Sequence, residues 1–527
     1  MAAPVQSIIV NGSAVILVDI ECRLSNNLPT IVIVGFANRA VGESKERIRG
    51  AFATSRIVLP RKRITVNLAP ADIPKADSGF DLAIAVAIMQ ASGQIGPAAW
   101  RGRPAFIGEL GLDGGVRAVR GIIGKILAGR AEGITTFFIP SANLGQACLV
   151  PNVSLVPIPD LSRLYRYLSG AEPCEPRHTG EGGRMPDGGN APSGTPRDVP
   201  LSEIAGQQQA KRALEIAAAG GHNILLDGPP GTGKSMLARA LHGLLPPLDR
   251  EEMLEVTQLH SLAGHDYGRI VTERPFRSPH HGASLVSITG GGSPLRPGEI
   301  SLAHRGVLLF DELPEFSRET IETLRQPLES RLINVTRAHG SAEWPADFIF
   351  VATANPCPCG YFGSSRPCGC PEWKRLSYRD RLSGPIFDRI DLYSNVHDVE
   401  YDKLLARRGT EIDADVRRRV RQARDRQKAR FGTRTRLNAD MTNAEVKRLP
   451  RLEPDALPVL NAAARGCDLS ARAYMRTIKV ARTIADLEAS AGVTGAHLAE
   501  ALKYRPDFTA GRRRSGQGGK DRVRPSV

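Results

Sequence analysis

One octapeptide constrains the fold of this chain more than any other feature. Residues 228–235 read Gly-Pro-Pro-Gly-Thr-Gly-Lys-Ser, which fits the pattern of a phosphate-binding loop. An apolar run, Ile224–Leu226, precedes the loop, and a helical pattern, Met236–Leu244, follows it. Backbone N–H groups of such a loop point toward phosphates, and the N-terminus of the following helix adds its positive end. The octapeptide therefore predicts a nucleotide site on an α/β sheet.

Lys234 and Ser235 are the functional side chains of this loop. We expect the Lys234 ammonium to reach the β- and γ-phosphates and the Ser235 hydroxyl to ligate Mg²⁺. The remaining nucleotide-binding positions of the loop are Gly228, Pro229, Pro230, Gly231, Thr232 and Gly233. A chance Gly-rich turn is the alternative, and the matching strand and helix on its two flanks argue against it.

Two further apolar runs end in polar residues that suit hydrolysis of a nucleotide. Leu308–Phe310 leads into Asp311 and Glu312, and Phe348–Ala352 is followed closely by Asn355. We expect Asp311 to hold the Mg²⁺ shell, Glu312 to activate water and Asn355 to contact the γ-phosphate and the attacking water. Loop solvation and turn formation are the plain alternatives for such residues. The order Asp then Glu favours hydrolysis.

Composition divides the chain into five parts. Residues 171–200 contain six Gly and six Pro and few large apolar side chains, so we expect a disordered linker. Residues 1–170 mix strand-like and helix-like runs, which is typical of an α+β domain. Residues 201–399 alternate apolar runs with helical stretches, which indicates a parallel sheet covered by helices. Helical periodicity continues over 400–507, a lid domain, and residues 508–527 form a basic tail that we expect to be disordered.

The charge balance points to an anionic partner. Lys plus Arg number 70 against 55 Asp plus Glu, so the formal net charge is +15. Nucleic acid is the partner that best suits this excess, and a merely solvated basic surface is the alternative. No apolar run approaches the roughly 18 residues that cross a bilayer, and the first twenty residues lack Lys and Arg. We therefore expect a soluble cytoplasmic protein with no membrane partner.

Longer stretches of the chain resemble the AAA+ ATPases and, more narrowly, the magnesium-chelatase-like ComM/YifB family. The matching stretches are Ile204–Gln207, Ala210–Asn223, Pro297–Gly306, Asp311–Phe316 and Asn355–Gly360. The likeness covers nearly all of the chain outside the linker and the tail. It implies an AAA+ P-loop parallel sheet with an α-helical lid, ATP and Mg²⁺ as cofactors, and Gln207 among the nucleotide contacts.

The resemblance also implies arginines that act between subunits. Ser383–Asp391 resembles the arginine-finger segment, so Arg389 would enter the ATP site of a neighbouring subunit and neutralise charge on the transferred phosphoryl group. Leu469–Arg472 resembles the sensor 2 segment, so Arg472 would act across the same interface. An arginine needed in trans implies a ring, most simply a homohexamer. An ordinary surface ion pair with a nearby aspartate is the alternative for Arg389.

The first 170 residues resemble a Lon-protease-type domain of the ribosomal S5 domain 2 fold. The likeness rests on Pro74–Leu82, Gly108–Arg117 and Gly121–Pro140. Lys125 takes the place of the protease's dyad lysine, but the nucleophile position falls near Gly79, and Ser78 is offset by one. Because Ser–Lys chemistry fails without a placed nucleophile, we expect no proteolysis. We expect this domain to dock DNA or a partner.

Four of the eight cysteines fall close together as two Cys-x-Cys pairs, namely Cys357, Cys359, Cys368 and Cys370. Four thiolates can surround one tetrahedral Zn²⁺, although the usual spacing in zinc sites is Cys-x₂-Cys. A cytosolic setting disfavours disulfides. Three interpretations stay open: a zinc site, reduced thiols in a Gly/Pro loop, and a redox sensor.

Three segments are candidates for contact with DNA. Arg417–Arg430 carries eight basic residues against one Asp, so we expect an amphipathic lid helix whose basic outer face binds phosphates or is only solvated. Arg277–Gly282 and Gly290–Arg296 fall between the two nucleotide motifs, where members of the family carry loops that face the ring pore. Gly-rich loops without such a role are the alternative.

Together these features predict a hexameric AAA+ ring that hydrolyses ATP and moves along DNA, branched or single-stranded. The resemblance implies branch migration of recombination intermediates during natural transformation as its task. Three alternatives stay open: a magnesium-chelatase-type motor subunit, a Lon-like protease, and a DNA-binding regulatory ATPase that does not translocate. Stimulation of the ATPase by DNA, peptide cleavage and unwinding of a four-way junction discriminate between them.

Overall fold

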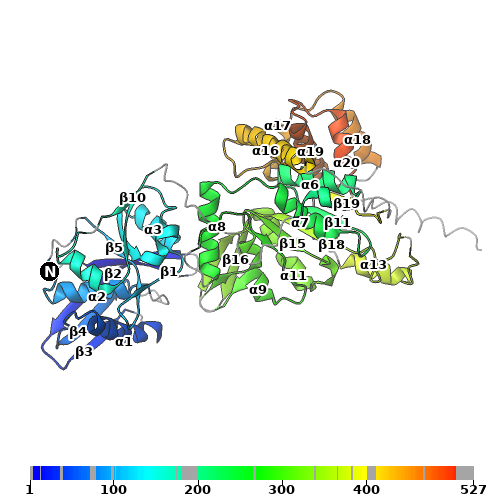
Figure 1. The fold of residues 1–527 in the computed structure, drawn as a ribbon. Coiled ribbons are helices and arrows are strands. Elements are labelled where there is room, and N and C mark those ends of the chain that lie inside the picture. Colours follow the sequence, from blue (N-terminus) through cyan, green and yellow to red (C-terminus); the bar gives the residue numbers. More distant parts are fainter. Residues whose placement is uncertain are drawn as a thin grey trace, which may run out of the picture.

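The computed structural model arranges the chain as three neighbouring units (Figure 1). The described residues are 4–11, 14–35, 39–71, 79–96, 100, 102–173, 175–180, 199–264, 269–292, 295–337, 340–364, 366–381, 384–399, 411–466 and 469–505. An N-terminal unit lies beside a central unit, and a helical unit covers one side of the central unit. Within the described ranges no helix combines the length and the apolarity needed to cross a bilayer.

The N-terminal unit is built on a mixed eight-stranded sheet with the order β10-β9-β8-β5-β1-β2-β4-β3. Its strands are β1 (Val5–Asn11), β2 (Ala14–Ser25), β3 (Thr30–Val34), β4 (Arg63–Ala69), β5 (Ala105–Phe106), β8 (Thr136–Pro140), β9 (Val153–Ile158) and β10 (Arg177–Thr179). A small ladder joins β6 (Glu109–Leu110) to β7 (Val116–Arg117). Antiparallel pairing of β1, β2 and β4 together with parallel pairing of β1, β5, β8 and β9 confirms the predicted α+β character.

Helices pack on both faces of this sheet because successive strand residues point to opposite sides. Ile9 and Phe138 belong to one core, and their neighbours Ile8 and Phe137 belong to the other. The helices are α1 (Arg39–Thr54), α2 (Asp81–Ala91), α3 (Ile122–Ala131), α4 (Leu144–Ala147) and α5 (Leu161–Leu168). The central unit joins the second core through α3, where Gly121 N donates to Ser261 Oγ at 3.0 Å.

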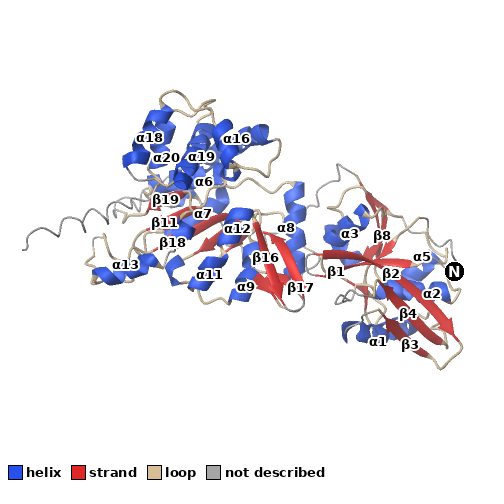
Figure 2. Cartoon of the chain, turned by 180° about the vertical axis from the view of Figure 1, so that it is seen from behind, coloured by secondary structure: helices blue, strands red, loops and turns tan. Residues whose placement is uncertain are grey.

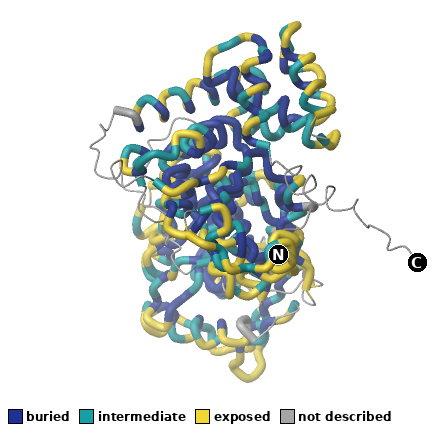
Figure 3. Tube along the Cα trace, turned by 90° about the vertical axis from the view of Figure 1, so that its right-hand side faces the viewer, coloured by how far each residue is buried: buried dark blue, intermediate teal, exposed yellow. Residues whose placement is uncertain are grey.

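The central unit contains a fully parallel five-stranded sheet with the order β12-β15-β18-β11-β19, as the apolar runs predicted. Its strands are β11 (Ile224–Asp227), β12 (Phe276–Arg277), β15 (Val307–Phe310), β18 (Ile349–Ala354) and β19 (Leu392–Asn395). All residues of β15 and β18 are buried, which is the pattern of a sheet covered on both faces. Figure 3 shows buried segments in the middle of the molecule, whereas helices at its periphery alternate buried and exposed residues.

Helices and two small hairpins surround this sheet. The helices are α6 (Gln208–Gly220), α7 (Lys234–Leu244), α8 (Arg250–Ala263), α9 (Leu285–Thr289), α10 (Glu299–Leu302), α11 (Arg318–Thr323), α12 (Arg325–Ser330), α13 (Glu372–Asp380) and α14 (Gly384–Phe387). The hairpins are β13 (Gly290–Gly291) with β14 (Arg296–Pro297), and β16 (Leu332–Arg337) with β17 (Gly340–Pro345).

The third unit is helical, and in Figure 2 it appears as blue helices above the central sheet. Its helices are α16 (Glu411–Phe431), α17 (Asn443–Arg448), α18 (Ala456–Gly466), α19 (Ala471–Leu487) and α20 (Gly495–Leu502). No strand occurs in residues 411–466 or 469–505. This arrangement agrees with the helical periodicity of the sequence after about Val399.

One expectation about the segments between units needs correction. Arg177–Thr179 fall inside the segment predicted as linker, yet they form β10 and pair with β9, so the linker cannot begin before them. Residues 181–198 and the predicted tail lie outside the described residues. Ser78 also lies outside them, whereas Lys125 is fully buried in α3.

The basic helix predicted at Arg417–Arg430 is α16, but its basic face does not point wholly outward. Arg424 donates to Ala218 O, near the C-terminal end of α6, at 2.9 and 2.8 Å. Arg426 donates to Asp486 O, near the end of α19, at 2.8 Å. The C-terminal end of a helix attracts cations, so these arginines hold α16 in place. The exposed basic residues of this segment are Arg417, Arg418, Arg421 and Lys428.

Candidate active site

The phosphate-binding loop connects β11 to α7 at the C-terminal edge of the parallel sheet. Gly231 and Gly233 have φ values of 82° and 88°, a region that residues with a side chain rarely adopt. A Cβ atom on Gly228 would lie 2.1 Å from Val396 O, so a larger residue would clash with the backbone. The backbone conformation therefore requires glycine at three positions of the predicted motif.

The ammonium group of Lys234 is buried inside this loop. Its Nζ donates to Gly228 O at 2.6 Å, to Pro229 O at 2.7 Å and to Asn355 Oδ1 at 3.1 Å. Burial lowers the pKa of Lys234, and the carboxylates around it, including Asp311, oppose that shift. The strand end that carries Asn355 thus meets the loop.

Asp311 and Ser235 place two oxygen donors side by side. Ser235 Oγ donates to Asp311 Oδ2 at 2.9 Å, and Thr353 Oγ1 donates to Asp311 Oδ1 at 2.6 Å. A hydroxyl and a carboxylate are donors that Mg²⁺ accepts, so this pair fits the ion that the nucleotide motif implies. Thr353 also accepts a bond from Glu312 N at 2.8 Å. The sequence did not single out Thr353, which orients both acidic residues at once.

Glu312 follows Asp311 in a left-handed conformation, with φ 55° and ψ 52°. This conformation is unusual for a residue with a side chain, and such strain is concentrated at functional sites. The Glu312 side chain is exposed at the same sheet edge as Lys234 and Asn355. Another predicted nucleotide contact, Gln207, donates to His397 O at 2.6 Å, one residue beyond the carbonyl that faces Gly228.

Arg389 and Arg472 lie at the opposite edge of the sheet, where they line one cavity of about 930 Å³. Arg389 precedes β19, and its backbone O accepts a bond from Asn223 Nδ2 at 3.0 Å, just before β11 begins. The four residues of β11 alone span about 13 Å, and the phosphate-binding loop follows their far end. The structure therefore brings the two predicted arginines together and separates them from the loop of the same chain.

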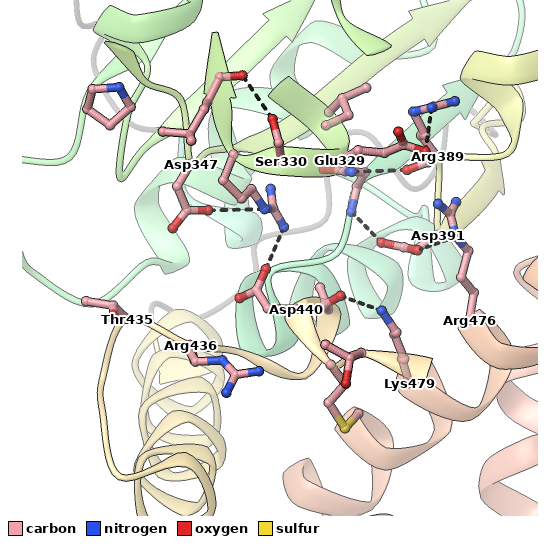
Figure 4. Close-up of a pocket in the computed structure, with 18 of the residues that line it drawn as sticks. Glu329, Ser330, Asp347, Arg389, Asp391, Thr435, Arg436, Asp440, Arg476 and Lys479 are labelled. Carbon is pink, nitrogen blue, oxygen red and sulfur yellow. Dashed lines mark hydrogen bonds and ion pairs between the residues drawn. The ribbon is translucent and has the colours of Figure 1, made fainter. Parts of the chain in front are cut away.

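Acidic side chains hold most of the arginines in this cavity (Figure 4). Arg389 Nη2 lies 2.5 Å from Glu329 Oε1, and Arg476 Nε lies 3.6 Å from Asp391 Oδ1. Burial favours a high pKa for Asp391, but Arg476 and its other cationic neighbours hold that pKa well below its usual range. Arg472 differs from the others, because 63% of its side chain is exposed and its nearest carboxylate, on Asp388, is 4.0 Å away.

The four clustered cysteines converge next to the phosphate-binding loop. Their Sγ atoms all lie within 4.8 Å of one another, and the Cys357–Cys359, Cys357–Cys368 and Cys359–Cys368 separations are 3.3, 3.7 and 3.6 Å. These separations are too long for a disulfide bond. Zn–S bonds of about 2.3 Å place the sulfurs of a tetrahedral site about 3.8 Å apart, so the cluster fits Zn²⁺.

The predicted DNA loops lie between β12 and α10. Arg277 forms a two-bond ion pair with Glu299, with both distances 2.6 Å, so its guanidinium is already engaged. The imidazole rings of His280 and His281 are 4.0 Å apart, and both residues are exposed. Gly290–Gly291 and Arg296–Pro297 form the hairpin of β13 and β14. The structure thus leaves the two histidines, rather than Arg277, open to a ligand in this region.

Comparison with known proteins covers nearly the whole chain. Three family models match: "Magnesium chelatase, subunit ChlI" at residues 200–404, "Subunit ChlI of Mg-chelatase" at 20–143, and "Magnesium chelatase, subunit ChlI C-terminal" at 410–505. Competence protein ComM of Haemophilus influenzae is 41% identical, over 93% of this chain and 94% of that protein. The uncharacterized protein YifB of Escherichia coli is 39% identical over the same shares. The magnesium-chelatase 38 kDa subunit of Rhodobacter capsulatus is 26% identical, over 57% of this chain and 84% of that subunit.

Proposed function

This chain belongs to the ComM/YifB family of magnesium-chelatase-like AAA+ ATPases, and on that premise we propose that it forms a ring that moves along DNA and migrates the branch points of recombination intermediates. Its use of ATP and Mg²⁺ follows from the family. One observation carries the proposal of a ring: the arginine cavity and the phosphate-binding loop lie at opposite edges of one sheet. The net charge of +15 and the competence protein among the relatives support DNA as the partner.

Within one chain, each polar residue of the loop edge has a distinct task. Lys234 and the backbone N–H groups of the loop hold the phosphates. Ser235 and Asp311 hold Mg²⁺, which when bound supplies positive charge against the phosphate oxygens. Glu312 takes a proton from the attacking water, and Asn355, now hydrogen-bonded to Lys234, positions that water and the γ-phosphate.

The remaining positive charge comes from the neighbouring chain. Arg389 and Arg472 of one subunit face the loop edge of the next, where their guanidinium groups offset charge that develops on the transferred phosphoryl group. Arg476 acts through Arg389 rather than on the nucleotide, because it donates to Ile390 O at 3.2 Å and pairs with Asp391. Repetition of this head-to-tail contact closes a ring, and we propose a hexamer.

The test of this function is ATP-driven movement of a fluorescently labelled four-way DNA junction. We expect the wild-type chain to move the branch point until the junction separates into duplexes. Lys234→Ala should move it at least about a hundredfold more slowly, because the bound phosphates lose a buried positive charge. Lys503→Ala is the matched control, since this lysine is exposed at the end of α20. ATP hydrolysis without junction movement would instead support the regulatory ATPase, and an ATPase indifferent to DNA would favour a chelatase-type role.

We also propose that the four clustered cysteines hold one structural Zn²⁺. Cys357 follows Asn355 by two residues, and Gly360 lies so close to the phosphate-binding loop that an added Cβ would be 2.7 Å from Pro230 Cδ. A metal at this point therefore fixes the strand end that carries Asn355 against the loop. Phe362 N donates to Cys357 Sγ at 3.4 Å, as backbone groups commonly do around thiolate ligands.

Metal analysis of the purified chain checks this proposal. We expect about one zinc per chain in the wild type and almost none in the double variant Cys359→Ser/Cys368→Ser. Cys148→Ser serves as the control, because Cys148 is a free cysteine of the N-terminal unit, remote from the cluster in sequence. A folded wild-type chain purified with zinc in the medium but without bound metal would favour reduced thiols.

A further inference from the structure

Large apolar side chains are exposed within the cysteine-rich loop and on the helix just after it. Trp373 is 69% exposed, Leu376 55% and Phe362 45%. Two of the three belong to α13, which buries only Tyr378 among its nine residues. Figures 1 and 2 both show α13 at the end of the central unit that is farthest from the N-terminal unit. Exposed apolar side chains close together in the chain are candidates for contact with a ligand or a partner.

Basic side chains are interleaved with these aromatic rings. The guanidinium carbon of Arg375 lies 4.1 Å from the centre of the Phe362 ring, and that of Arg366 lies 5.4 Å from the centre of the Tyr361 ring. Lys374 follows Trp373 in the chain and is exposed, as is Glu372 on the other side of Trp373. Arginine planes stacked on aromatic rings, with further cations around them, match the alternation of flat bases and phosphates in a nucleic acid strand.

These features favour a single strand over a duplex or a second copy of the chain. An aromatic ring can stack only on a base that is not already stacked in a duplex. The core of an interface between copies is depleted of lysine, whereas Lys374 adjoins the most exposed ring. The basic residues of α16, in contrast, have no aromatic residue among them before Phe431 and suit backbone contact only.

We propose that Trp373 binds single-stranded DNA by stacking on an unpaired base, and that Lys374 and the Arg375–Phe362 stack, whose cations follow Trp373 within one turn of α13, contact the same strand. The inference rests on the proposed DNA function and deepens it, because unpaired bases become available where a branch point moves. This surface also adjoins the nucleotide site. The loop that carries Phe362 contacts Pro230 through Gly360, so the strand would be held next to the phosphate-binding loop.

Fluorescence of the full-length protein with fluorescein-labelled oligo(dT) tests the proposal. Of the three tryptophans, Trp344 is 3% exposed, Trp100 of the N-terminal unit is partly buried and Trp373 is 69% exposed, so stacking on Trp373 should quench part of the intrinsic emission. We expect Trp373→Ala to raise the Kd for oligo(dT) about tenfold, and Trp373→Phe to keep the affinity but lose the quenching. Leu376→Ala is the matched control, because Leu376 is exposed on the same helix but has no ring to stack.

Three results would overturn the inference or separate it from the proposed function. Unchanged affinity and quenching in Trp373→Ala would show that this ring does not stack, even where the wild type still moves a four-way junction. Equal weakening by Leu376→Ala, together with loss of self-association in sedimentation, would identify the surface as a contact between copies. A wild-type chain that binds neither oligo(dT) nor a junction would refute the DNA function itself.

Discussion

Replacing Glu312 with glutamine should leave ATP binding intact and slow ATP hydrolysis about a thousandfold. Glutamine has the shape of glutamate but cannot accept a proton from water at neutral pH. The backbone around Glu312 should keep its conformation, because Glu312 N is bonded to Thr353 Oγ1 at 2.8 Å and Thr353 is bonded to Asp311. Binding of a fluorescent ATP analogue and the rate of phosphate release measure the two properties separately.

The matched control for this substitution is Glu315→Gln. Glu315 is an exposed acidic residue that ends the short 3₁₀ helix Leu313–Glu315, directly after Glu312, where it lies 3.8 Å from Arg381 and bonds to Tyr378. We expect its substitution to leave phosphate release close to the wild-type rate. If Glu312→Gln hydrolyses ATP as fast as this control, the general base lies elsewhere in the site.

The residues of the loop edge could be predicted because their signals are local. The octapeptide at 228–235 and the Asp311–Glu312 pair are continuous in the sequence, and the strands before them are short apolar runs. Thr353 could not be predicted in the same way. Its role depends on two neighbouring strands placing its hydroxyl between Asp311 and Glu312, residues more than forty positions earlier in the chain.

For the basic helix α16, the sequence predicted the helix but not the contacts of its arginines. The sequence predicted an amphipathic helix with a basic outer face, and in the structure Val420 and Ala423 of this helix are fully buried. The sequence could not reveal that Arg424 reaches Ala218 O, because the two residues are 206 positions apart. A charged run shows where cations lie in the sequence, whereas only the packing shows which of them already bind a helix end.

The cysteine cluster could be predicted only in part. The two Cys-x-Cys pairs are visible in the sequence, but their spacing left three interpretations open. The four Sγ atoms converge within 4.8 Å in a loop that turns at Gly360, where φ is 83°. The exposed ring of Trp373 was also unpredictable, because α13 has no sequence feature that distinguishes a covered helix from an uncovered one.

The second large effect is expected for Arg389, and it can be tested in mixtures of two variants. Arg389→Ala alone should hydrolyse ATP about a thousandfold more slowly than the wild type, because the arginine finger is lost from every site. Arg318→Ala is the control, since Arg318 is an exposed arginine at the start of α11. Loss of activity alone does not show in which subunit Arg389 acts, because removal of its pair with Glu329 could also disturb the fold.

Mixing Arg389→Ala chains with Glu312→Gln chains resolves this question, because neither variant is active by itself. In a head-to-tail ring assembled from equal amounts, about a quarter of the interfaces join an intact Glu312 on one chain to an intact Arg389 on the next. Phosphate release should therefore recover to as much as about a quarter of the wild-type rate. If each site lay within one chain, the mixture would show only the sum of the two variants' own residual rates. Recovery must also depend on the order of preparation: chains mixed after separate, stable ring assembly should stay inactive until the rings exchange subunits. A mixture that never exceeds that sum under exchanging conditions would assign Arg389 to its local pair with Glu329 and remove the physical argument for a ring.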